Sequence, residues 1–105
     1  MKYQQAKERA KVLKALAHPM RILIVEALNK EDLCVRDICA LGTVSQSNVS
    51  RHLAMLKRAG IVSDRRIKMS VMYRLETPSV LETFEPAAKA VRQDIKRRTA
   101  RVKNV

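Results

Sequence analysis

One segment, TVSQSNVSRHLAMLKRAG at positions 43–60, constrains the fold of this chain more than any other. Ser45 is a residue type that caps helix N-termini, and Gly60 is the type that ends helices in the left-handed conformation. Between them, three apolar residues recur at the spacing of one helix face: Val49, Leu53 and Leu56. The segment therefore predicts a short amphipathic helix with one buried face.

The opposite face of this helix is polar. At 100° per residue, Ser47 lies about 160° and Arg51 about 200° from Val49. Small hydrogen-bonding side chains and arginine are the groups that read base edges in the major groove of DNA. The predicted reading residues are Gln46, Ser47, Asn48, Ser50 and Arg51. His52 is a further candidate, although it lies about 300° from Val49, at the border of the apolar stripe, where core packing is an equal alternative.

A second short helix is predicted directly before this segment. Asp32 is its candidate N-cap, Val35, Ile38 and Leu41 are expected to face inward, and Gly42 is expected to end it. Two short helices joined by a glycine-containing turn form a helix-turn-helix, whose second helix enters the major groove.

Three more helices are predicted outside this motif. Residues 3–16 place apolar side chains on one stripe, and Pro19 fits the first turn of a buried helix through MRILIVEALNK. Pro78 precedes a last helix through SVLETFEPAAKAVRQDIKRR, in which Pro86 marks a kink or the true start. The apolar stripes of the first and last helices are expected to pair across a two-fold axis.

The residues that follow Gly60 predict a β-hairpin wing. IVSDRRI and VMYRLE are rich in strand-forming residues and flank KMS. Arg65, Arg66 and Lys68 lie at or near the hairpin tip, where they are expected to reach phosphates or a minor groove. The alternative is an edge hairpin whose charges only prevent pairing with other strands. The predicted fold is mainly α, a single winged helix-turn-helix domain over 1–105 with about five helices and a two-stranded antiparallel wing.

The charge distribution points to a polyanionic partner. The chain carries a net charge of +12, and residues 45–75 hold seven Lys/Arg against one acid. Such a basic block favours nucleic acid, although RNA or a merely soluble basic protein stays open. One Phe, two Tyr and no Trp leave few rings to stack on unpaired bases, which favours duplex DNA.

Other classes of protein find little support in the sequence. The residues show no phosphate-binding loop and no clustered carboxylates, so no catalytic site is expected. No apolar run approaches the roughly 20 residues of a membrane span, and MKYQQAKERAK is polar throughout. We therefore expect a cytoplasmic protein that is not an enzyme and has no membrane partner.

The only two cysteines, Cys34 and Cys39, lie five residues apart in LCVRDIC. In an ideal helix, five residues rise about 7.5 Å and turn the two side chains about 140° apart. In a reducing compartment, such a pair is more typical of metal binding or redox sensing than of a structural disulfide. Alternatively, Cys39 is a core residue and Cys34 an incidental surface thiol.

Most of the chain resembles the ArsR/SmtB family of metal-sensing transcriptional repressors. The resemblance rests on LKALAHPMRILIVEAL, on LCVRDIC, and above all on SQSNVSRHLAMLKRAGIVSDRR followed by YRL. It implies a winged-helix homodimer, built from the first and last helices, that binds a palindromic operator in double-stranded DNA. It also implies that an inducer releases the DNA.

The resemblance further implies a thiol site for the inducer. The arsenic-responsive type carries Cys-Val-Cys-Asp-Leu-Cys, and CVRDIC matches it at Cys34 and Cys39, with Arg36 in place of the middle cysteine. Residues 78–105 hold no His, so the zinc site of the last helix is absent. No cofactor is obligatory, and the implied inducer is As(III) or Sb(III), whose third ligand is exogenous, comes from elsewhere or is missing. A redox or reactive-sulfur switch and a constitutive DNA-binding protein are the alternatives.

Overall fold

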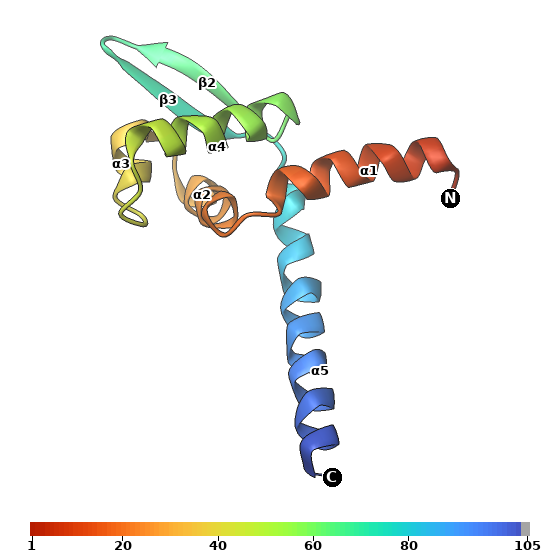
Figure 1. The fold of residues 1–105 in the computed structure, drawn as a ribbon. Coiled ribbons are helices and arrows are strands. Elements are labelled where there is room, and N and C mark those ends of the chain that lie inside the picture. Colours follow the sequence, from red (N-terminus) through yellow and green to blue (C-terminus); the bar gives the residue numbers. More distant parts are fainter. Residues whose placement is uncertain (104–105) are drawn as a thin grey trace.

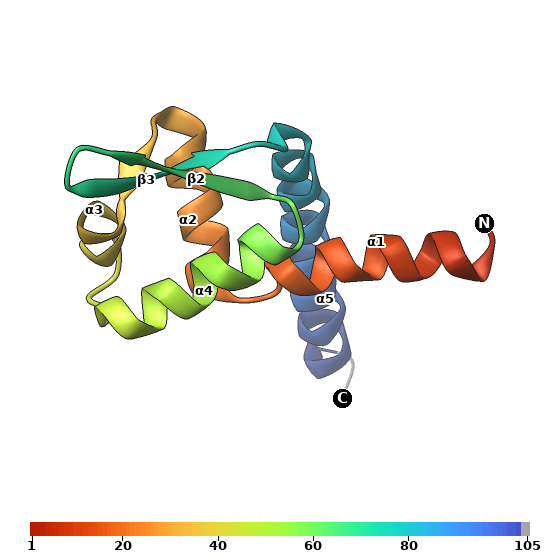
Figure 2. The same cartoon turned by 90° about the horizontal axis from the view of Figure 1, so that it is seen from above.

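The computed structural model describes residues 1–103 and confirms a winged helix-turn-helix fold. In chain order, its elements are α1 (Tyr3–Leu16), α2 (Pro19–Lys30), β1 (Leu33–Cys34), α3 (Val35–Cys39), α4 (Gln46–Arg58), β2 (Val62–Ile67), β3 (Ser70–Leu75), the 3-10 helix η1 (Pro78–Thr83) and α5 (Phe84–Lys103). Helices α2, α3 and α4 and the sheet form a body, from which α1 and α5 extend as two arms (Figure 1; Figure 2).

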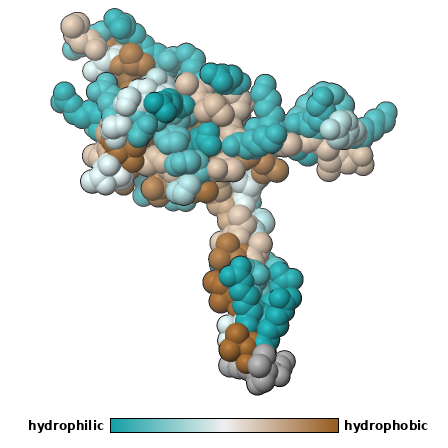
Figure 3. Space-filling view, viewed as in Figure 1, coloured by the Kyte–Doolittle hydropathy of each residue, from teal (hydrophilic) through white to brown (hydrophobic). Residues whose placement is uncertain are grey.

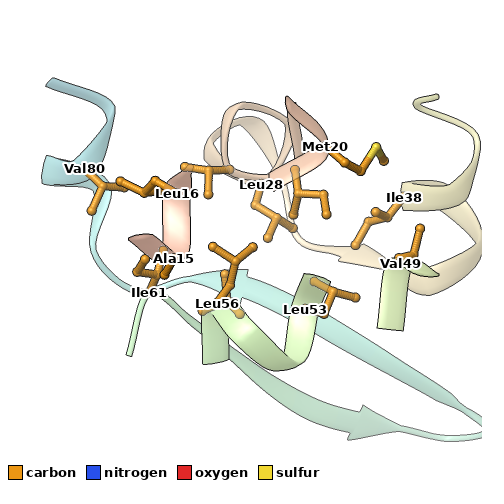
Figure 4. Packing of buried hydrophobic residues seen from close by; sticks show 13 residues of the cluster. Ala15, Leu16, Met20, Leu28, Ile38, Val49, Leu53, Leu56, Ile61 and Val80 are labelled. Atoms are coloured by element: carbon orange, nitrogen blue, oxygen red, sulfur yellow. The ribbon is translucent and has the colours of Figure 1, made fainter. Parts of the chain in front are cut away.

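The core lies where α2 and α4 meet the sheet and the ends of both arms (Figure 4). Helix α2 crosses its centre and buries four side chains, as its apolar sequence predicts. The predicted stripe of α4 is confirmed, because Val49, Leu53 and Leu56 are fully buried. These three side chains hold α4 against the body and leave its polar face outward.

Both predicted ends of α4 are also confirmed. The backbone N–H of Asn48 donates to the Ser45 hydroxyl over 3.3 Å, which satisfies one of the free amides at the helix start. Gly60 follows the C-cap Ala59 with φ +77°, a left-handed conformation that costs glycine little.

The predicted start of the third helix is wrong. Asp32 does not cap α3, because residues 33–34 form strand β1, and Cys34 is the N-cap. The Asp32 carboxylate instead accepts a hydrogen bond from Arg65 over 3.0 Å and lies 3.8 Å from Arg74. The sheet therefore has three antiparallel strands in the order β1-β3-β2, and not the two that were expected. A two-residue strand is too short to show alternation in the sequence.

The end of this helix also differs from the prediction. Ile38 is fully buried as expected, but α3 ends at Cys39, and Leu41 is exposed. The left-handed conformation falls on Thr43, with φ +44°, and not on Gly42. Gly42 instead leaves room for Met20, because a Cβ at position 42 would lie only 3.3 Å from the Met20 sulfur.

The last helix begins later than Pro78. Pro78 opens η1, and α5 begins at Phe84, so Pro86 lies in the first turn of α5, where a missing N–H costs no helical hydrogen bond. Of the two predicted roles of Pro86, a place at the helix start is therefore nearer to the structure, although α5 begins two residues earlier, at Phe84. Within residues 1–103, no helix combines the length and apolar character that a membrane crossing requires.

The two arms expose apolar side chains along their length. On α1, Tyr3 is 79% exposed and Leu13 54%, while on α5 Val91 is 59% exposed and Ile95 57%. Figure 3 shows apolar side chains on the surface of the α5 arm. The core reaches the arms at the ends nearest the body, where Ala15 and Leu16 of α1 are buried and Phe84 of α5 packs against the core, next to Val80 of η1.

Candidate DNA interface and thiol site

The polar face of α4 is presented as one continuous surface. The five predicted reading residues are all exposed: Gln46, Ser47, Asn48, Ser50 and Arg51. They lie on the first two turns of α4, so the N-terminal half of the helix carries the hydrogen-bonding groups. The Ser45 and Ser47 hydroxyl oxygens are 3.2 Å apart, which orders the first turn.

The wing divides its basic residues between two faces. Arg65 is paired in register with Met72, and Arg66 with Val71. Because side chains alternate along a strand, the two arginines point to opposite faces of the sheet. Arg65 bonds to Asp32 and ties β2 to the segment before β1, whereas Arg66 and Lys68 are exposed near the tip. This geometry favours Arg66 and Lys68 over Arg65 as phosphate contacts.

An ion pair connects the wing to α4. The ammonium group of Lys57, near the end of α4, lies 2.9 Å from the Asp64 carboxylate on β2. The hydrogen bond to Asp64 raises the pKa of Lys57 and keeps it charged. The Lys57–Asp64 ion pair shows that the face of β2 that carries Asp64 is turned towards α4. Arg66, two residues along the strand, lies on this same face. Sequence reasoning missed the pair, because its partners belong to different elements.

His52 packs against His18, and the two ring centroids are 4.2 Å apart. The backbone N–H of Met20 donates to His18 Nδ1 over 3.0 Å, so His18 caps α2 and its ring joins α2 to α4. Burial lowers the pKa of His52, and the positive charges of His18, Arg21 and Arg51 lower it further. Packing is therefore the observed role of His52, and its DNA contact stays a prediction.

The two cysteines belong to different elements. Cys34 lies in β1, paired with Met72, and its backbone N–H and thiol both donate to the same Asp37 carboxylate oxygen, over 3.4 and 3.2 Å. Cys39 is the last residue of α3 and packs partly against the core. Because Cys34 has extended backbone angles, the ideal-helix separation of the two thiols does not apply. The spacing of Cys34 and Asp37 is that of a capping box, a signal that the sequence did contain.

Both thiols line one open cleft of about 630 Å³. Its other walls come from three parts of the body: α3, the first residue of α4, and the start of β3. These lining residues are Val35, Arg36, Asp37, Gln46, Ser70 and Val71. Within residues 1–103, no group of three or more His, Cys, Asp or Glu is arranged to hold a metal ion. The cleft therefore offers two sulfur donors beside the start of α4 and the start of β3.

A short helix with an exposed hydrogen-bonding face, packed against a preceding helix and flanked by a basic wing, defines a winged helix-turn-helix DNA-binding regulator. Residues 18–64 match the profile of the bacterial regulatory proteins of the arsR family. The chain belongs to the ArsR/SmtB family, whose members are DNA-binding transcription regulators.

Three similar proteins illustrate this membership. The transcriptional repressor SmtB homolog of Synechocystis is 35% identical over 88 residues, which cover 84% of this chain and 67% of that protein. The arsenical resistance operon repressor of Escherichia coli is 42% identical over 65 residues, which cover 61% of this chain and 56% of that repressor. The crystal structure of NolR from Sinorhizobium fredii has a TM-score of 0.75 and 31% identity, covering 84% of this chain and 88% of its own.

Proposed function

We propose that this protein is a homodimeric repressor that binds a palindromic operator and releases it when a trivalent arsenical or antimonial binds Cys34 and Cys39. The observation that carries this proposal is the shared cleft, which brings both thiols beside Gln46 of α4 and the start of β3. Thiolates are the ligands that soft metalloids prefer. Similarity to the arsenical resistance repressor of Escherichia coli supports the same inducer class.

Operator binding is assigned to the polar face of α4 and to the wing. The groups suited to base edges are Gln46, Ser47, Asn48, Ser50 and Arg51, while Arg66 and Lys68 suit phosphates. A two-fold dimer presents two such surfaces, which requires two operator half-sites in inverted order. The operator is therefore expected to be palindromic.

Dimerisation is assigned to α1 and α5. Both helices protrude from the body and expose apolar side chains, among them Tyr3, Leu13, Val91 and Ile95, which two-fold pairing would cover. Sedimentation at micromolar concentration is expected to give a dimer. A single monomeric species that binds one half-site tightly would contradict this assignment.

Release follows from the position of Cys34 in the chain. To bind the same metalloid atom as Cys39, the Cys34 thiol must leave the Asp37 carboxylate, which disrupts the start of α3. Helix α3 packs against α4, and Cys34 pairs with β3, so the disturbance reaches both DNA-binding elements. Coupling between ligand and operator is expected to be about 1–3 kcal/mol.

The decisive experiment measures operator release by fluorescence anisotropy under reducing conditions. Wild-type protein is expected to release DNA as arsenite or antimonite is added, and Cys34→Ser with Cys39→Ser is expected to bind DNA but not respond. Equal release from the double variant would exclude the thiols as the sensor. Release by peroxide or polysulfide, but not by arsenite, would favour a thiol redox switch instead.

A further inference from the structure

Helix α4 has a different neighbour on each edge of its exposed polar face. Measured from Val49 at 100° per residue, Arg51 lies at about 200°, in the middle of this face. Lys57, at about 80°, is bound to the wing, whereas His52, at about 300°, packs against His18. Figure 1 shows the wing above α4 and α2 below it. A helix in the major groove lies between two phosphate backbones, so the wing suits one backbone and the histidine edge suits the other.

The histidine edge holds an open cavity of about 340 Å³ between α2 and α4. The residues that line it are His18, Met20, Val44, Asn48, Arg51 and His52. Among the lining residues that the structure describes, none carries a carboxylate, while Arg51 is a permanent cation and Asn48 has amide donors. Because Nδ1 of His18 accepts the Met20 amide over 3.0 Å, a neutral His18 carries its proton on Nε2 and can donate it. The cavity therefore offers the donors and the positive charge that suit a phosphate oxygen.

The charges around His52 all have the same sign. Burial lowers the pKa of His52, and the positive charges of His18, before α2, of Arg21, on α2, and of Arg51, on α4 itself, lower it further. The other side chains that line the cavity, such as Met20, add no charge. Within residues 1–103, the buried Nε of Arg21 has no hydrogen-bond partner. A negative group in the cavity would therefore favour the protonated form of His52.

We propose that this cavity binds one backbone phosphate of each operator half-site, and that His52 takes up a proton from solution as the phosphate enters. The proposal rests on the assignment of operator reading to α4. The phosphate oxygens accept hydrogen bonds from the imidazolium of His52 and from Nε2 of His18. Since the complex then holds more protons than the free protein, operator affinity rises as the pH falls.

The histidine content of the chain makes this dependence easy to isolate. The whole chain holds two histidines, and both line the cavity. Histidine is the side chain whose ordinary pKa falls between pH 5 and 8. A change of operator affinity over that range can therefore be traced to His18 and His52.

The test measures operator affinity by fluorescence anisotropy at pH 7.5 and 6.0 and at constant ionic strength, with a duplex that the protein has selected from random sequence. The wild type is expected to bind about tenfold more tightly at pH 6.0. His52→Gln is expected to bind equally at both pH values. Arg66→Ala, on the wing edge, is the matched control: it should lower affinity at both pH values and keep the tenfold rise.

Two further measurements locate the phosphate. A neutral methylphosphonate, placed at one operator position at a time, is expected to abolish the pH dependence of the wild type at one position per half-site. The same replacement should cost no further affinity in His52→Gln. In the NMR spectrum of the wild type, the operator is expected to raise the pKa of the His52 imidazole, because phosphate stabilises its charged form. Millimolar inorganic phosphate is expected to leave that pKa unchanged.

The outcomes separate this proposal from the function on which it rests. If wild-type affinity does not change with pH, or if the operator leaves the pKa of His52 unchanged, the phosphate site is wrong while operator binding stands. If inorganic phosphate raises that pKa as much as the operator does, the cavity binds free phosphate and the DNA contact is wrong. If no selected duplex binds better than a scrambled one, operator reading by α4 fails, and the phosphate site fails with it.

Discussion

The two helices of the helix-turn-helix are held in place very differently. Helix α4 spans 13 residues, begins at a serine hydroxyl cap and buries three side chains completely. Helix α3 spans five residues, begins at a cysteine and buries only Ile38 completely. Helices this short depend on tertiary contacts for their stability. The comparison indicates that α4 is the more firmly anchored of the two helices. The proposed function therefore assigns DNA reading to α4 and the ligand-induced deformation to α3.

The largest expected effect tests how firmly α4 is anchored. Leu53→Ala removes a fully buried side chain between α4 and the core, and is expected to lower the free energy of unfolding by about 2–5 kcal/mol. Leu41→Ala, beyond the end of α3, removes a partly exposed leucine and is expected to cost much less. Urea denaturation of both variants measures the difference, and equal losses would contradict the comparison.

The next effect concerns reading rather than stability. Arg51→Ala or Ser47→Ala is expected to weaken specific operator binding by about 1–3 kcal/mol without changing the unfolding midpoint. Arg101→Ala removes the same charge from exposed α5 and serves as the control for net charge. Anisotropy titrations with operator and scrambled duplexes separate a loss of sequence-specific affinity from a general loss caused by the lower net charge. Loss of affinity for both duplexes alike would place these residues among backbone contacts.

The wing provides a matched pair of arginines. Arg66→Ala is expected to lower affinity for all duplexes and to reduce the salt dependence by about one unit of slope. Arg65→Ala should change that slope less, because the Arg65 guanidinium already bonds to Asp32 on the other face of the sheet. Binding measured between low and high salt checks both variants. A larger slope change in Arg65→Ala would reverse the assignment of the faces.

The two helix caps sharpen the comparison at a smaller scale. Ser45→Ala removes the hydroxyl that caps α4 and is expected to cost about 1 kcal/mol of stability. Cys34→Ser keeps a polar cap on α3 and should change stability by only a few tenths of a kcal/mol, since serine is a strong N-cap. Thermal unfolding measures both. An unresponsive but fully stable Cys34→Ser protein would show that the thiol serves sensing and not folding.

Sequence patterns predicted α4 well because its signals are local. A serine cap, an apolar stripe and a terminal glycine all fall within 16 residues, and the structure confirms each of them. The predicted bounds of α1 and α2 agree with the observed bounds, Tyr3–Leu16 and Pro19–Lys30, because their signals are also local. The outward face of α4 followed directly from the buried one.

The region around the cysteines was predicted less well because its structure depends on distant residues. Strand β1 exists only through its pairing with β3, in which Leu33 lies opposite Tyr73, 40 positions away in the sequence. Because of that pairing, the N-cap of α3 is Cys34 and not the predicted Asp32. Asp32 instead forms ion pairs with Arg65 and Arg74. The cleft arises in the same way, since α3, α4 and β3 meet only in the folded chain.

The smallest expected effect tests the contact that joins α4 to α2. Burial and neighbouring positive charges lower the pKa of His52 below its ordinary value of 6.5, so between the two pKa values the unfolded chain binds more protons than the folded one. Stability is therefore complete above about pH 6.5 and falls as the pH drops through the folded pKa. His52→Gln should flatten this decline, measured by urea denaturation at several pH values between 7.5 and 5. His18→Asn, which keeps an oxygen acceptor for the Met20 amide, is the matched control and should leave part of the decline in place, because burial is the main cause of the His52 shift. A decline as steep in His52→Gln as in the wild type would mean that other groups set the acid limit, and that the histidine pair contributes packing alone.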